Sequence, residues 1–241
     1  MKLRYDFHLH SCLSPCGDNE MTPYNLVNMA RIMGLDAVAL TDHNTARNTP
    51  AAVKAGKEAG LLVLPGMELC VSEEAHIVCL FGEIEQALDF SAYVEERLPD
   101  IPNRPEIFGE QRLMDGEDHV TGLYDKLLLT AADISVEEVH ALVGRYGGIS
   151  FPAHIDRDSY SVVSALGTFS STWGFSAAEL TRHADEAAYR TRYPQLCGCT
   201  ILRNSDAHYL EDIGCAGGEM EAECLEWDSV VRALTKTEHN F

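Results

Sequence analysis

Short apolar runs alternate with amphipathic stretches along most of this chain. The apolar runs predict strands at residues 3–10, 35–40, 61–64, 76–81, 149–151, 175–180 and 200–202. Helices are expected at about 23–33, 49–59, 135–145 and 227–234. Such alternation is typical of an α/β protein with a parallel barrel, so we expect one barrel domain over residues 1–241.

Two of the predicted helices have clear start signals. Thr22 is a good helix cap, and Pro23 suits the first helical position. Ser135 and Glu138 have the spacing of a capping box, which predicts a helix that begins there.

The segment from about residue 98 to 125 breaks this alternation. It holds Pro99, Pro102 and Pro105, many charges and little periodicity, and it is long for a simple connection. We interpret it as an irregular insertion over one end of the barrel. A lid and an exposed polar loop both remain open as its role.

Histidine and acidic side chains follow the apolar runs at several places. His8 and His10 are two residues apart in a strand, so both side chains point to the same face. The other residues of this kind are Asp42, His43, Glu68, His76, His154, Asp206 and His208. Ligands scattered along a chain but gathered at strand ends are how a barrel builds a metal site.

Composition narrows the range of functions. The formal net charge is −20, from which we expect repulsion of nucleic acid polymers and of anionic membranes. The first residues lack the apolar stretch of a signal peptide, which predicts a cytoplasmic location. The eight cysteines are then expected to be reduced thiols, although Cys12 or Cys16 could be a soft metal ligand.

Together, these motifs resemble the PHP (polymerase and histidinol phosphatase) family. The matching stretches are residues 6–10, 41–44, 66–68, His76, 152–154 and 205–208. The resemblance implies a distorted seven-stranded (β/α) barrel with a metal site at the C-terminal ends of its strands. It also implies up to three divalent metal ions and hydrolysis of phosphoric esters.

Carried over by position, the resemblance implies three metal positions, with Glu68 bridging two of them. The first set is His8, His10, Glu68 and Asp206, the second is Glu68, His76 and His154, and the third is His43 and His208 with an aspartate. Family members commonly place that aspartate directly after a serine, whereas this chain reads Ser14-Pro15-Cys16-Gly17-Asp18. Asp18 is therefore the candidate for the third position.

The implied chemistry uses zinc, manganese or iron, because imidazole and carboxylate together suit these ions. A hydroxide bridging two metals would attack phosphorus, with Glu68, His154, Asp206 and His208 as the catalytic residues. Arg157 and Arg182 are candidates for binding the substrate phosphate. The expected substrate is a small phosphorylated metabolite, such as a nucleotide or histidinol phosphate.

Two other interpretations remain open. Barrels with a His-x-His pair also occur in amidohydrolases, which cleave C–N bonds. A regulatory module that keeps the metal site without catalysis is the second alternative.

Overall fold

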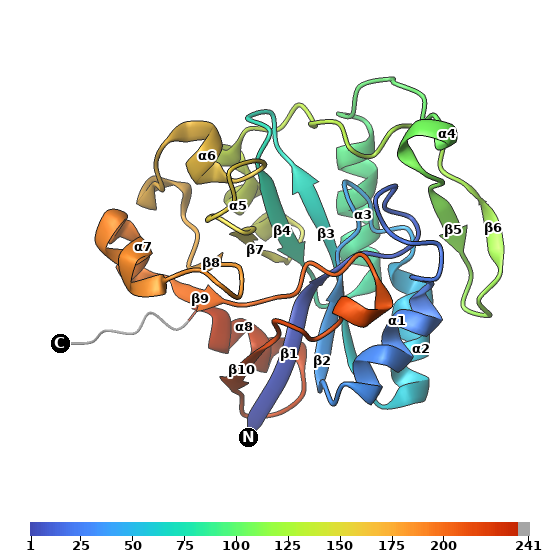
Figure 1. Ribbon diagram of the computed structural model, residues 1–241, viewed down its shortest axis with the longest axis horizontal. Helices are drawn as coiled ribbons and strands as arrows, with labels where there is room; N and C mark the ends of the chain where they lie inside the picture. Colours follow the sequence, from blue (N-terminus) through green and yellow to red (C-terminus); the bar gives the residue numbers. More distant parts are fainter. Residues whose placement is uncertain (236–241) are drawn as a thin grey trace.

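The computed structural model describes residues 1–235, and its largest element is a curled six-stranded sheet (Figure 1). Its strands are, in spatial order, β10 (Gly218–Glu221), β1 (Lys2–Leu9), β2 (Ala37–Leu40), β3 (Leu62–Cys70), β4 (His76–Leu80) and β7 (Ile149–Pro152). β1, β2 and β3 run parallel, as expected from the helices between them.

The expectation of an all-parallel arrangement is wrong at β4. β4 runs antiparallel to both β3 and β7, and β10 runs antiparallel to β1. The reason is the length of the connection between β3 and β4, which consists of residues 71–75. A parallel neighbour needs a crossover of about a dozen residues or more. A connection as short as this one can therefore only form a hairpin.

A second pair of strands continues the curl. β8 (Ala177–Glu179) and β9 (Thr200–Leu202) are parallel to each other. The Ile155 backbone N–H donates to the Glu179 carbonyl at 2.9 Å, which joins the end of β7 to β8. Beyond β9, Ala207 forms a parallel bridge with Leu9 of β1. The result is an α/β fold with a strongly curled sheet.

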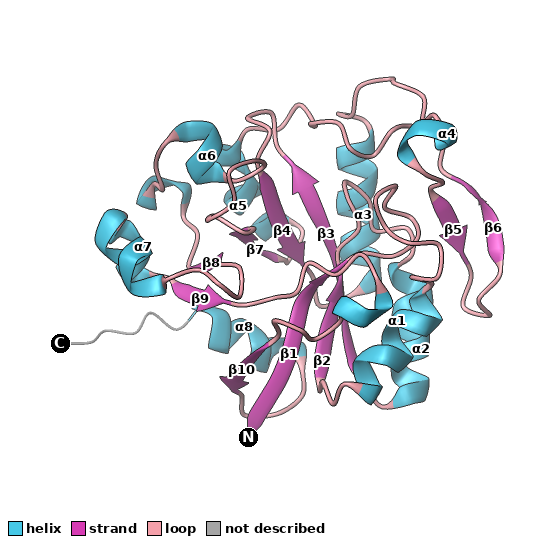
Figure 2. Cartoon of the chain, in the orientation of Figure 1, coloured by secondary structure: helices cyan, strands magenta, loops and turns pink. Residues whose placement is uncertain are grey.

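Helices cover the outside of this sheet (Figure 2). They are α1 (Pro23–Ile32), α2 (Thr49–Ala59), α3 (Ile84–Glu95), α4 (Pro105–Phe108), α5 (Val136–Arg145), α6 (Val162–Leu166), α7 (Glu186–Arg192) and α8 (Trp227–Thr235), with 3-10 turns η1 (Ser171–Trp173), η2 (Pro194–Gly198) and η3 (Leu210–Asp212). Thr22 caps α1 through the Asn25 N–H, and Ser135 forms the predicted capping box with Glu138. Among residues 1–235, no helix combines the length and apolar character that crossing a bilayer requires.

The inner face of the sheet packs into one apolar cluster that α8 also enters. Phe7, Val78 and Phe151 belong to it, together with Val230 and Leu234 of α8. The pairing of β1 with β2 shifts register between Asp6 and Leu9. Phe7 lies in the inner cluster, whereas Leu9 packs with α1 and α2 in another. Such a local irregularity re-aims side chains, and here it occurs where the histidine pair begins.

The segment 98–125 is more ordered than the sequence suggested. It contains α4 and a hairpin of β5 (Arg112–Met114) and β6 (Val120–Leu123), which Figure 1 shows beyond α1 and α2. The Arg112 N–H donates to the Cys12 carbonyl at 3.0 Å, and the Met114 N–H donates to the Asn48 side chain at 2.9 Å. These bonds fix the hairpin against the loop that follows β1.

Gln111 should be the main anchor of this hairpin. Its buried amide donates to the Tyr124 and Lys126 carbonyls and accepts from the Leu128 N–H. Gln111→Ala would leave these buried groups without partners, so we expect the free energy of unfolding to fall by about 1–3 kcal/mol. Urea unfolding measures this loss, with the exposed Gln195→Ala as the matched control. Equal stability of the two variants would contradict the assignment.

Candidate metal centre

Four strands deliver the first ligands to one end of the sheet. His8 and His10 are fully buried at the end of β1, and His43 follows β2. A parallel bridge pairs His43 with Glu68, which lies inside β3. His76 opens β4, and because β4 runs opposite to β3, the start of β4 lies beside the end of β3. The reversal of β4 is therefore what brings His76 to the site.

Two loops complete the arrangement from the other side. His154 follows β7, and the segment after β9 carries Asp206 and His208. The His10 N–H donates to the Ala207 carbonyl at 3.1 Å, which holds this segment against β1. His154 and Asp206 both have left-handed backbone conformations, with φ of 27° and 53°.

The carboxylate of Glu68 lies at the middle of the site and is 1% exposed. Imidazoles surround both of its oxygens. Oε1 lies 3.0 Å from His8 Nε2, 2.9 Å from His76 Nδ1 and 3.2 Å from His154 Nε2, and Oε2 lies 2.9 Å from His43 Nδ1 and 3.4 Å from His10 Nε2.

Asp206 forms a second acidic point beside Glu68. Its Oδ1 lies 3.1 Å from His10 Nε2 and 3.4 Å from His8 Nε2. Its Oδ2 accepts from the Arg157 guanidinium at 2.8 Å. The two carboxylates thus share the same pair of histidines.

The ligand atoms form three groups, in each of which they lie within 4.8 Å of one another. The groups are His8, His10, Glu68 and Asp206; His43, Glu68 and His76; and His10, His43 and His208. The first has the membership that the sequence predicted. In the second, His43 stands where His154 was expected, although His154 remains 3.2 Å from Glu68.

The structure does not bring Asp18 into these groups. Its carboxylate accepts from the Glu20 N–H at 2.8 Å and so closes a local turn. Cys16 comes closer instead, with its Sγ 3.1 Å from His208 Nε2. Burial opposes ionisation of this thiol, but the neighbouring His43 and His208 lower the pKa of Cys16 to about 6.

Several buried atoms of the site have no hydrogen-bond partner among the described residues. They are Nε2 of His8 and His10, Nδ1 of His43, Oε2 of Glu68 and Oδ1 of Asp206. Buried polar atoms are rarely left this way in native proteins. Here they face one another as lone-pair donors, so the residues fit divalent cations. The nitrogen and oxygen donors suit zinc, manganese or iron.

The charges of these groups favour cation binding. Burial opposes ionisation of Glu68, but His76, His8 and His43 hold its pKa well below the usual range. Burial, with His208 and His43 nearby, holds the pKa of His10 well below its ordinary value. His10 is therefore neutral, which is the form in which imidazole binds a metal.

Glu179 supports the site, and the sequence interpretation missed it. Its carboxylate lies 3.0 Å from His8 Nδ1 and accepts from the His154 N–H and the Asn204 side chain. An acidic residue inside the apolar run 175–180 was the available signal. Because a carboxylate only accepts, it keeps the proton of His8 on Nδ1 and leaves Nε2 free for a metal.

Asp42 orients the imidazole of His10 through the hydroxyl group of Ser14. It accepts from the Ser11 N–H and from the Ser14 hydroxyl, both at 2.7 Å. The Ser14 oxygen in turn lies 3.0 Å from His10 Nδ1. Since the Ser14 hydrogen is donated to Asp42, its oxygen accepts from His10, and Nε2 of His10 is again the free atom.

The two arginine candidates differ in position. Arg157 contacts Asp206 and is about half exposed at the edge of the site. Arg182 is exposed and donates to the neighbouring His183 at 2.8 Å. Arg157 is therefore the one that the structure brings to the centre.

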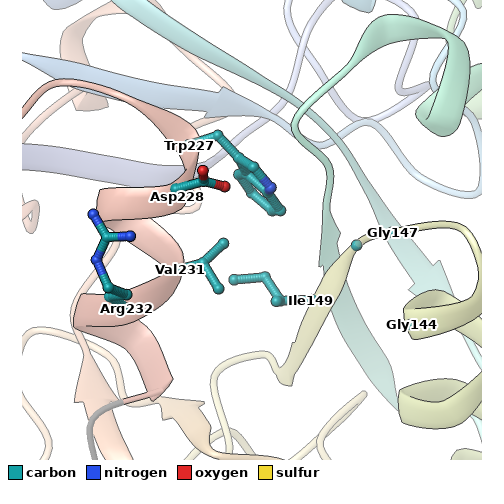
Figure 3. Close-up of a pocket in the computed structure, with 8 residues that line it drawn as sticks. Gly144, Gly147, Ile149, Trp227, Asp228, Val231 and Arg232 are labelled. Atoms are coloured by element: carbon teal, nitrogen blue, oxygen red, sulfur yellow. The ribbon is translucent and has the colours of Figure 1, made fainter.

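A separate cavity of about 420 Å³ lies between α8 and the turn before β7. Figure 3 shows Trp227 and Val231 of α8 facing Ile149 across it. None of the metal-centre residues lines this cavity.

Comparison with known families agrees with the geometry. Residues 6–94 match the model of the PHP domain family. The match confirms, over these residues, the resemblance that the motifs predicted. It also supports the predicted class of a metal-dependent hydrolase of phosphoric esters.

Curated relatives match the same part of the chain. A 5'-3' exoribonuclease from Haemophilus influenzae is 33% identical over 82 residues, which are 34% of this chain and 29% of the relative. A DNA polymerase III of PolC type from Streptococcus pneumoniae is 33% identical over 91 residues, which are 38% of this chain and 6% of the polymerase. The chain thus spans less than a third of either relative.

Solved structures with a similar fold cover nearly the whole chain. The lesion-specific endonuclease EndoQ from Pyrococcus furiosus has a TM-score of 0.75 at 18% identity, over 98% of this chain and 56% of that one. Endonuclease Q in complex with a 27-mer duplex has a TM-score of 0.70 at 17% identity, over 96% of this chain and 56% of that one. A two-domain protein from Bacteroides vulgatus that contains a predicted PHP-like metal-dependent phosphoesterase has a TM-score of 0.58 at 15% identity, over 98% of this chain and 63% of that one.

These comparisons overturn one expectation. The exclusion of nucleic acid polymers, inferred from the net charge of −20, is contradicted by a similar fold that binds a DNA duplex. The physical reason is that net charge sums the whole surface, whereas binding depends on the local potential. Divalent cations bound by the ligand groups near Arg157 would reverse that potential at the site.

Glu179 should control metal affinity through His8. Glu179→Gln removes the negative charge and replaces one of the two acceptor oxygens by a donor, so the acceptor of the His8 Nδ1 proton is weakened. We expect zinc affinity to fall by about 10- to 100-fold. Competition with a chromogenic chelator measures this, and Glu223→Gln at an exposed ion pair is the control. Equal zinc affinities in the two variants would show that Glu179 does not position His8.

Proposed function

We propose that this chain is a metal-dependent hydrolase of phosphoric esters. The observation that carries the proposal is the Glu68 carboxylate, buried among the imidazoles of His8, His43 and His76 and adjoining Asp206 through His8. This arrangement offers one carboxylate to two neighbouring groups of ligands.

The ligand groups define which residues would hold each ion. His8, His10, Glu68 and Asp206 would hold one. Glu68, His76 and His154 would hold a second, because nitrogens of both histidines lie within 3.2 Å of Glu68 Oε1. Metal ions bound there would lower the pKa of a water molecule and take up negative charge on the phosphoryl oxygens. We retain His154 and His208 as predicted catalytic residues at the edges of these groups. The metals themselves are proposed as zinc, manganese or iron.

The chain's own contribution is to fix the ligands before substrate arrives. Glu179 sets the proton of His8, and Ser14 sets that of His10, so both Nε2 atoms face the centre. Burial excludes water from these ligands, which strengthens every electrostatic interaction inside the site.

Arg157 is proposed to bind the phosphate. One of its terminal nitrogens contacts Asp206, which leaves other N–H groups of the guanidinium for a second anion. Tyr160 follows in the same loop. Its half-exposed ring stacks on that of His76, with the ring centroids 4.8 Å apart. Together they give the substrate a cation and a flat apolar face at the mouth of the site.

Two substrate classes enter the proposal. A small phosphorylated metabolite is the class expected from the motifs. Phosphodiesters in nucleic acid are the second, because an exoribonuclease, a DNA polymerase and a lesion endonuclease are among the similar proteins.

All eight cysteines are free, which supports the proposed cytoplasmic location.

A substrate panel tests the activity. Protein loaded with zinc, manganese or iron should hydrolyse phosphate monoesters or oligonucleotides, and chelation should stop it. Glu68→Gln should abolish the activity and lower the metal content, because the bridging charge is lost. Product assays and elemental analysis measure the two effects, with Glu223→Gln as control. Chelator-resistant activity in metal-free protein, or cleavage of cyclic amides alone, would refute the proposal.

Arg157→Lys tests the phosphate contact. Lysine keeps the charge but loses the planar pair of donors, so KM should rise and kcat/KM should fall by about tenfold. Metal content should stay unchanged. Arg182→Lys is the matched comparison, because Arg182 is exposed and donates to His183 instead. If only the Arg182 variant lost activity, the role would belong to that residue.

A further inference from the structure

The loop after β1 is folded so that Cys16 turns back toward the metal centre. The Ser14 N–H donates to the Ser11 carbonyl at 3.0 Å, and the Gly17 N–H donates to the Ser14 carbonyl at 2.8 Å. A side chain at Gly17 would meet the Ser11 carbonyl oxygen at 2.5 Å, so this turn requires glycine after Cys16. The insertion braces the loop from outside, where Gly109 packs against the Pro15 carbonyl.

The imidazole of His208 faces the sulfur with its lone pair. His208 Nδ1 lies 2.8 Å from the Asp206 carbonyl oxygen, which can only accept, so Nδ1 carries the proton. The other nitrogen, Nε2, lies 3.1 Å from Cys16 Sγ. Two potential ligand atoms therefore face each other at the surface end of the centre.

A second observation, independent of the cysteine, marks the same place. His43 is 5% exposed, and its Nδ1 has no hydrogen-bond partner among the described residues. His10, His43 and His208 form one of the three ligand groups. That group lacks the carboxylate that each of the other two contains, and Asp18 is held in its own turn.

We propose that Cys16 is the anionic ligand of this third group and binds a metal ion as a thiolate together with His43 and His208. The proposal deepens the proposed function, on which it rests only for the location of the centre. A sulfur ligand favours zinc or ferrous iron and disfavours manganese or magnesium. The third position would then differ in metal preference from the two that share Glu68.

Cobalt substitution tests the ligand without any activity measurement. A Co²⁺–thiolate bond gives a near-ultraviolet charge-transfer band that oxygen and nitrogen ligands do not give. We expect the band in the wild-type protein and in Cys215→Ser, since Cys215 is an exposed thiol that is in none of the ligand groups. It should be absent in Cys16→Ser, with one metal ion fewer per chain. Cys16→Asp should restore the lost ion without the band and shift the preference of this position toward manganese.

Alkylation of the wild-type protein gives a second measurement that requires no variant. Iodoacetamide should modify Cys16 in metal-free protein and spare it after zinc is added, while the exposed Cys197 reacts in both states. A band that persists in Cys16→Ser, or equal alkylation of Cys16 with and without zinc, would overturn the proposal. Phosphoesterase activity in the same samples would leave the proposed function standing, whereas failure to bind any metal would refute both.

Discussion

Burial of one carboxylate, that of Glu68, is the constraint on which the rest of the site depends. Removing an ion from water costs several kcal/mol unless opposite charge or hydrogen bonds offset it. The fold meets this demand by bringing imidazoles from β1, β2, β4 and the loop after β7 to its two oxygens. The reversal of β4 belongs to the same solution, because a parallel β4 would carry His76 to the opposite end of the sheet.

The sequence was sufficient to predict which residues meet in the innermost group. His8, His10, Glu68 and Asp206 were found because each stands at or near the end of an apolar run, where strand direction alone determines position. The antiparallel β4 was also within reach, since residues 71–75 are too few for a crossover. The alternation of strands and helices predicts parallel neighbours, and it carries no information on the length of each connection.

Other features could not be predicted, because they depend on loop conformation and on distant partners. The approach of Cys16 to His208, while Asp18 closes its own turn, depends on a loop whose shape is fixed by Gly17 and by the insertion. Glu179 and His8 are 171 positions apart, and nothing local to either residue indicates the contact. Net charge misled for a related reason: it records how many charges the chain has, not where they lie.

The left-handed backbone at His154 and Asp206 limits how this centre can change over evolutionary time. Histidine, aspartate and asparagine tolerate that conformation better than most residues, while bulky or β-branched residues fit it poorly. Coordination chemistry and backbone geometry therefore select the same few amino acids at both positions. Glutamate at position 206 would keep the negative charge but would fit the left-handed backbone less well. Substitution by another ligand type is therefore disfavoured both by metal coordination and by backbone conformation.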